Sequence, residues 1–124
     1  MYTVVVVVAA ILGVAVVAMG VAYLVAPVAN AKGFGLPAWP EGVLAAWLNI
    51  KGIRDVGMGV ALLVLLATAG PHVMGWYLLV SAIVPIGDAV IVLRHGGSKV
   101  LALGMHAATA AVIVAVAAVL LLAG

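Results

Sequence analysis

The sequence has no cysteine and very few charges. Of its 124 residues, five are Lys or Arg and three are Asp or Glu, which is 6% of the chain. A soluble domain carries about 25% charged residues. The lack of cysteine excludes disulfides, thiolate catalysis and zinc sites with cysteine ligands. The net charge of +2 is too small to form a phosphate-binding surface, so we expect no nucleic-acid partner.

Apolar residues dominate the remainder of the sequence. They make up 69% of the chain, and this figure leaves out the 15 glycines. A water-soluble domain of this size cannot bury so much apolar surface, and we therefore expect the solvent of this protein to be lipid. Residues 1–31 contain no charge, and the stretches 56–87 and 100–124 contain no Lys, Arg, Asp or Glu and one histidine each.

Three breaks divide the chain into segments long enough to cross a bilayer, which takes about 20 apolar residues in a helix. The breaks are residues 30–42, Gly70-Pro71 and residues 94–98. The sequence predicts an all-α fold, an integral membrane four-helix bundle that forms a single domain over residues 1–124. The predicted helices lie near residues 3–29, 43–69, 71–93 and 98–123.

The cations indicate an orientation in the membrane. Lys32, Arg94 and Lys99 lie in or beside the 30–42 and 94–98 connections, whereas the two termini carry no Lys or Arg. Cytoplasmic loops are enriched in such residues. We therefore expect a multi-pass protein of the plasma or inner membrane, with both connections in the cytoplasm and both termini outside it.

The 30–42 connection is the longest and contains Phe34, Trp39 and two prolines. Aromatic residues often anchor a chain at the level of the lipid headgroups. Alternatively, Gly33 and Gly35 make the segment mobile enough to act as a lid over a site between the helices. The sequence leaves both interpretations open.

The helix predicted at 43–69 carries the densest group of polar side chains. Its members are Trp47, Asn49, Lys51, Arg54 and Asp55. Ionisable residues inside a span are costly, and by default they face the bundle interior and mark a functional site. At about 100° per residue, all of these except Asn49 lie within an arc of about 100°. Gly52 and Gly59 form a ridge next to this arc, where a second helix can approach closely.

The other two polar helices bring matching groups to the same depth. In the third helix, Tyr77, Ser81 and Asp88 share one face, and the fourth helix contributes His106. With a rise of about 1.5 Å per residue, the buried ionisable groups lie about 8–18 Å from the cytoplasmic helix ends. These groups are Lys51, Arg54, Asp55, Asp88 and His106. We expect them to surround one pocket in the cytoplasmic half, where the opposite charges balance.

This arrangement predicts a pocket for a small lipophilic molecule with a polar or anionic group. Lys51 and Arg54 are the predicted ligands of that group, and Asn49, Trp47, Tyr77 and Ser81 are further predicted contacts. Asp88, His106 and Asp55 are the candidates for proton transfer, because carboxylates and histidine are common acids and bases. Whether the protein is an enzyme stays open. If it is one, we expect an isomerase or hydratase that needs no cofactor. The histidine spacing does not predict a metal site.

Two other functions fit the same residues. The protein could be a proton-coupled transporter that works as a homodimer, with Asp55 or Asp88 binding proton and substrate in turn. It could also be a membrane assembly protein without catalytic activity. In that case the pairs Arg54–Asp88 and Lys51–Asp55 only hold the helices together. Membrane lipid is an expected partner in each case.

A family resemblance accompanies these polar motifs. The sequences Lys51-Gly52-Ile53-Arg54-Asp55 and Pro85-Ile86-Gly87-Asp88, followed by Arg94-His95-Gly96 and by His106 in the last helix, resemble a family of small four-span membrane proteins. That family is a domain of unknown function found in bacteria and fungi, and the resemblance covers about residues 30–124. It implies a four-helix membrane fold with these polar residues as its signature, and it implies no reaction.

Overall fold

The computed structural model describes residues 1–123, and within this range the secondary structure is entirely helical. The fold class predicted from the sequence, all-α, is confirmed. The elements, in chain order, are α1 (Tyr2–Val25), α2 (Pro27–Lys32), the 3₁₀-helix η1 (Gly42–Ala45), α3 (Ala46–Thr68), α4 (Pro71–Ser81), α5 (Ile83–Arg94), α6 (Lys99–Leu101), the π-helix η2 (Ala102–Ala107) and α7 (Ala108–Ala123).

Three helical segments are long and apolar enough to cross a membrane. They are Tyr2–Val25, Pro71–Arg94 and Lys99–Leu122. Large apolar side chains on their outer faces are exposed, for example Val7, Ile11 and Val14 on α1. Lipid is the solvent that stabilises such a surface, since soluble proteins rarely expose large apolar patches. The chain is therefore a small membrane protein. Helix α3 has 23 residues and differs from these segments in carrying three charged side chains.

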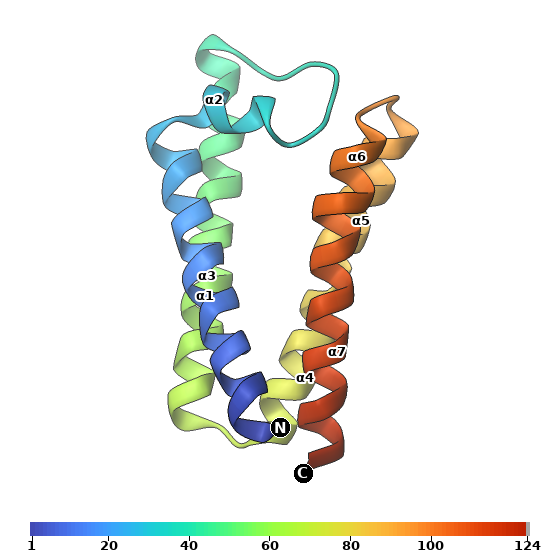
Figure 1. The fold of residues 1–124 in the computed structure, drawn as a ribbon. Coiled ribbons are helices and arrows are strands. Elements are labelled where there is room, and N and C mark those ends of the chain that lie inside the picture. Colours follow the sequence, from blue (N-terminus) through green and yellow to red (C-terminus); the bar gives the residue numbers. More distant parts are fainter. Residues whose placement is uncertain (124) are drawn as a thin grey trace.

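The helices form two antiparallel pairs. Figure 1 shows α1 beside α3, and α4 and α5 beside the last helical segment, which contains η2 and α7. The pairs converge at the end where both termini lie and diverge towards the end that contains α2 and α6 (Figure 1). The backbones of the two pairs are therefore closer together near the termini than at the opposite end (Figure 1).

Glycines bring α1 and α3 into close contact, as the Gly52 and Gly59 ridge predicted. A Cβ atom at Gly59 would lie 2.7 Å from the carbonyl oxygen of Gly13, and one at Gly52 would lie 2.7 Å from that of Gly20. Because the obstacles are backbone atoms, no side chain can move aside to make room. The two helices can pack this closely only with glycine at these positions.

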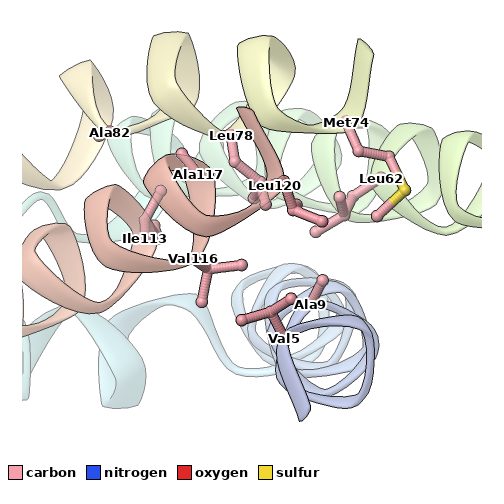
Figure 2. Packing of buried hydrophobic residues seen from close by; sticks show 10 residues of the cluster. All are labelled: Val5, Ala9, Leu62, Met74, Leu78, Ala82, Ile113, Val116, Ala117 and Leu120. Atoms are coloured by element: carbon pink, nitrogen blue, oxygen red, sulfur yellow. The ribbon is translucent and has the colours of Figure 1, made fainter. Parts of the chain in front are cut away.

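The hydrophobic core joins the two pairs near the termini. Figure 2 shows its buried side chains, which are Val5, Ala9, Leu62, Met74, Leu78, Ala82, Ile113, Val116, Ala117 and Leu120. Val5 and Ala9 lie near the start of α1, and Leu120 lies near the end of α7. The packed contact between the pairs is thus concentrated at one end of the molecule.

Two helix interruptions differ from the predicted boundaries. The first helix ends at Val25 rather than near residue 29, because Ala26 leaves the helical conformation (φ −136°, ψ 67°). The Asn30 amide stabilises this break by donating to the carbonyl oxygens of Ala22 and Ala26, at 3.0 and 2.8 Å. The third predicted helix is interrupted at Ala82. Pro85 has no N–H to donate to the carbonyl of Ser81, and this weakens the helix there.

The glycine contact between α1 and α3 can be tested with two substitutions on the same helix, one at the contact and one away from it. Gly59→Ala forces α1 and α3 apart, since the new methyl group would lie 2.6–2.9 Å from atoms of Gly13 and Val17. We expect it to destabilise the protein by about 1–3 kcal/mol. Gly57→Ala lies on the same helix with no atom within 4 Å of the new methyl group. Gly57→Ala should leave the midpoint temperature of thermal unfolding in detergent micelles unchanged or slightly higher. An equal fall of the midpoint in both variants would contradict this packing.

Candidate functional site

A cavity of about 360 Å³ lies between the two helix pairs. One end of its lining is apolar, with Leu12, Val16, Leu62, Leu78 and Ile113. The other end holds polar and ionisable groups, namely Tyr23, Lys51, Asp55, Asp88 and His106. From Leu12 to Tyr23 the lining of α1 extends about 16 Å, at about 1.5 Å per residue. The cavity is therefore elongated, with one apolar end and one polar end.

Methionines add a second property to the lining. Met19, Met58 and Met105 come from three different helices, and all three line the cavity. The methionine side chain is unbranched and polarizable, so it adapts to ligands of different shapes. The part of the cavity wall that these methionines form can therefore adapt to the shape of a ligand.

Lys51 is held by three neighbours. Its Nζ donates to Asp55 Oδ2 at 2.7 Å, one helical turn further along α3. The same ammonium lies 4.0 Å from the centre of the Tyr23 ring and 5.4 Å from that of Phe34. A carboxylate and the faces of aromatic rings both stabilise a cation in a site with little water.

His106 and Asp88 face each other across the polar end. His106 Nδ1 lies 4.0 Å from Asp88 Oδ2, while His106 Nε2 lies 2.8 Å from the carbonyl oxygen of Phe34. A carbonyl oxygen only accepts hydrogen bonds, so Nε2 carries a proton and donates it. In the neutral ring this leaves Nδ1 unprotonated and directed towards Asp88. The Phe34 carbonyl therefore selects the tautomer in which Nδ1, on the side of Asp88, can accept a proton.

The local backbone around His106 is irregular. Residues Ala102–Ala107 form a π-helix, whose extra residue per turn changes the direction of the side chains that follow. His106 is 6% exposed there, and its ring packs against Phe34 with the ring centres 4.3 Å apart. Such π-helical turns occur frequently at functional sites.

Tyr77 and Ser81 line the cavity, but their hydroxyl protons are used within the protein. Tyr77 donates to the carbonyl oxygen of Met58 at 2.7 Å, which connects α4 to α3. Ser81 donates to the carbonyl oxygen of Tyr77, also at 2.7 Å. Both oxygens can still accept a hydrogen bond from a ligand.

Part of the 30–42 connection lines the polar end of the cavity. Gly33 and Phe34 belong to the lining, and the Gly35 carbonyl accepts a hydrogen bond from the Ser98 N–H at 2.8 Å. Gly35 has φ +118°, a conformation that favours glycine. A smaller cavity of about 150 Å³ shares part of this lining, since Tyr23, Phe34 and Lys51 also line it. These three side chains therefore separate the two spaces.

Three of the predicted site residues lie outside the cavity lining. The Arg54 side chain is exposed, and the Trp47 side chain is 68% exposed. Gly52 is packed on α1, and at about 100° per residue Arg54 lies about 160° from it on the helix. The glycine contact therefore turns Arg54 away from the cavity, and our expectation that it lies with the other ionisable groups needs correction. Asn49 donates instead to the carbonyl oxygens of Tyr23 and Leu24.

The ion pairs also differ from one of the predicted sets. Within residues 1–123, the pairs formed are Lys51–Asp55 and the longer His106–Asp88 contact. The Arg54–Asp88 pair that an assembly role would use is not among them. In the same range, no three His, Asp or Glu side chains are grouped as they would be to hold a metal ion.

The sequence analysis missed Tyr23 and Phe34 as parts of the site. Between Thr3 and the end of α1, Tyr23 is the one polar-tipped side chain, and its isolation within an apolar run was the available signal. Phe34 contributes through its ring and its backbone carbonyl, 72 residues away from His106 in the chain. No local pattern indicates a contact of that kind.

Comparison with known proteins places the chain in a family. A family model described as "Domain of unknown function (DUF4267)" matches residues 13–120. The match includes the second half of α1, which the resemblance seen in the sequence did not cover. Searches of curated proteins and of solved structures gave no match. Since the matched region covers most of the sequence, the chain belongs to the family known as Domain of unknown function (DUF4267).

Proposed function

We propose that this membrane protein binds a small lipophilic molecule in the cavity between its two helix pairs. The observation that carries the proposal is the division of the lining into an apolar end and a polar end. A ligand would lie along the helices, with its apolar part near Leu62 and Ile113 and its polar group near Asp88 and His106. Ligand sites commonly combine an apolar lining with a few well-placed polar groups.

The polar end is unlike a contact that only holds helices together. Lys51 and Asp55 satisfy each other within α3, so they do not connect different helices. Asp88 and His106 lie on different elements but are 4.0 Å apart, beyond hydrogen-bond distance. Ionisable residues placed in a span without a tight partner are expensive to keep, and by default they indicate a functional site.

Proton transfer to or from the bound molecule is a chemistry that this pair supports. Asp88 and His106 Nδ1 are two neighbouring proton acceptors, because Nε2 is committed to the Phe34 carbonyl. A molecule that reaches the space between them could give a proton to one of these groups and take it back at another atom, as in general acid–base catalysis. Such a step needs no cofactor.

We further propose that all four long helical stretches cross the membrane, with the end that contains α2 and α6 in the cytoplasm. Lys32, Arg94 and Lys99 lie at that end, and cytoplasmic segments are enriched in such cations. A reporter that is active only outside the cytoplasm, fused after the C-terminal helix, should then be active. Activity of a cytoplasm-specific reporter at the same point would contradict this orientation.

The cavity proposal predicts that filling the apolar end blocks binding. Val16 lines the cavity, and Val16→Trp should occupy part of the space. With decanol as the probe, we expect the thermal midpoint of the unaltered protein in nonionic micelles to rise by several degrees, because a ligand that binds only the folded state stabilises it. Val16→Trp should lose this rise.

The control for this experiment lies on the same helix. Val14 is 59% exposed on the outer face of α1, and Val14→Trp adds the same side chain outside the cavity. It should keep the full decanol effect, since any change that decanol causes in the micelle is common to both variants. Equal decanol effects in Val16→Trp and Val14→Trp would refute binding in this cavity.

The histidine geometry gives a spectroscopic prediction. In protein labelled with ¹⁵N-histidine, the neutral His106 ring should have its proton on Nε2 and none on Nδ1. The chemical shifts of the two ring nitrogens distinguish the tautomers. His95 and His72 give resonances that can be removed by substitution with Gln. A proton fixed on Nδ1 of neutral His106 would contradict the tautomer that the Phe34 carbonyl selects, and with it the proposed role of Nδ1 as a proton acceptor.

A further inference from the structure

The cations near the cavity are not available to bind an anionic group. Lys51 donates to Asp55 at 2.7 Å and lies over the rings of Tyr23 and Phe34. Moving its ammonium to a ligand would cost these three interactions. Arg54 does not line the cavity. The two side chains that the sequence predicted as ligands of an anion therefore do not offer one a site.

The hydroxyl groups at the polar end already donate their hydrogen bonds to backbone carbonyls. Tyr23 donates to the Asn30 carbonyl at 3.2 Å, and Thr109 donates to the Met105 carbonyl at 2.6 Å. Tyr77 and Ser81 donate to backbone carbonyls as described above. The polar atoms that these side chains present to the cavity are thus acceptors.

Asp88 is the carboxylate left with accepting capacity. Its side chain is 30% exposed towards the space between the helices, and among the described residues its contact is His106 Nδ1 at 4.0 Å. With His106 neutral, the lining carries Lys51 as its one cation and Asp55 and Asp88 as its two anions. The net charge of the lining is then negative. Because Lys51 pairs with Asp55, we assign this net charge to Asp88.

We propose that the bound molecule carries a positively charged nitrogen, such as a protonated amine, that pairs with Asp88. This inference rests on the proposed binding function and names the class of ligand. An ammonium group supplies the donors that the lining lacks and balances its charge, and the ring of Tyr77, which also lines the cavity, favours a cation. A carboxylate at the same place would meet Asp88 and be repelled.

The experiment compares three probes that share one chain, namely decylamine, decanol and decanoate, near neutral pH. Each is titrated against the full-length protein in nonionic micelles, and the thermal midpoint reports binding. We expect decylamine to bind at least roughly tenfold more tightly than decanoate, the ratio that one hydrogen bond to a charged group provides. Decanol should fall between them.

Two variants identify the residue responsible. Asp88→Asn keeps the size of the side chain and removes its charge, so the preference for the amine should disappear. Glu41→Gln removes an acid that lies outside the cavity and bonds to Trp39, and it should keep the full preference. Because micelle charge affects all variants equally, the difference between these two variants reports the contribution of Asp88.

Each outcome separates this inference from the function on which it rests. Equal or tighter binding of decanoate, or an amine preference that persists in Asp88→Asn, would overturn the inference and leave the cavity proposal standing. Absence of a stabilising effect from all three probes would overturn the cavity proposal itself. The ranking of probes on the unaltered protein decides the question even if Asp88→Asn fails to fold.

Discussion

The close packing of α1 on α3 determines which side chains of α3 face the cavity. Gly13, Gly20, Gly52 and Gly59 let the two backbones touch, and this fixes how α3 is rotated about its axis. Once Gly52 lies against α1, Asp55 is directed between the helix pairs and Arg54 is directed away from them. The packing that stabilises the fold therefore also selects which charges enter the cavity.

The second consequence concerns where the helix pairs separate. The hydrophobic core joins them near the termini, and no comparable cluster of the described residues joins them at the opposite end. The 30–42 connection spans that end instead, through the Phe34 carbonyl on His106 and the Gly35 carbonyl on Ser98. An open interior in a membrane protein needs polar walls to hold water or ligand, and Asp88 and His106 provide them. The fold thus combines an apolar core near the termini with a cavity whose polar end is lined in part by the 30–42 connection.

Much of this could be predicted from the sequence, because composition and helical periodicity are local properties. The all-α membrane fold follows from long apolar stretches, and the position of Lys51 and Asp55 on one face follows from their spacing. Arg54 was misplaced because residue spacing gives only relative positions around a helix, whereas the rotation of α3 towards its neighbours is set by the contact of Gly52 with α1. Phe34 could not be predicted, since its role depends on a backbone carbonyl and on a loop conformation set by distant contacts.

If the cavity between the helix pairs holds water at its polar side chains, a small polar reagent should reach them, and the absence of native cysteine allows a direct test. Single cysteines at Ser81, which lines the cavity, and at Val80, which is 61% exposed on the outer face, differ by one residue. A small, water-soluble, cationic methanethiosulfonate reagent should modify Ser81→Cys much faster than Val80→Cys, because thiolate forms only where water reaches it. Equal protection of both, or faster modification of Val80→Cys, would contradict the account.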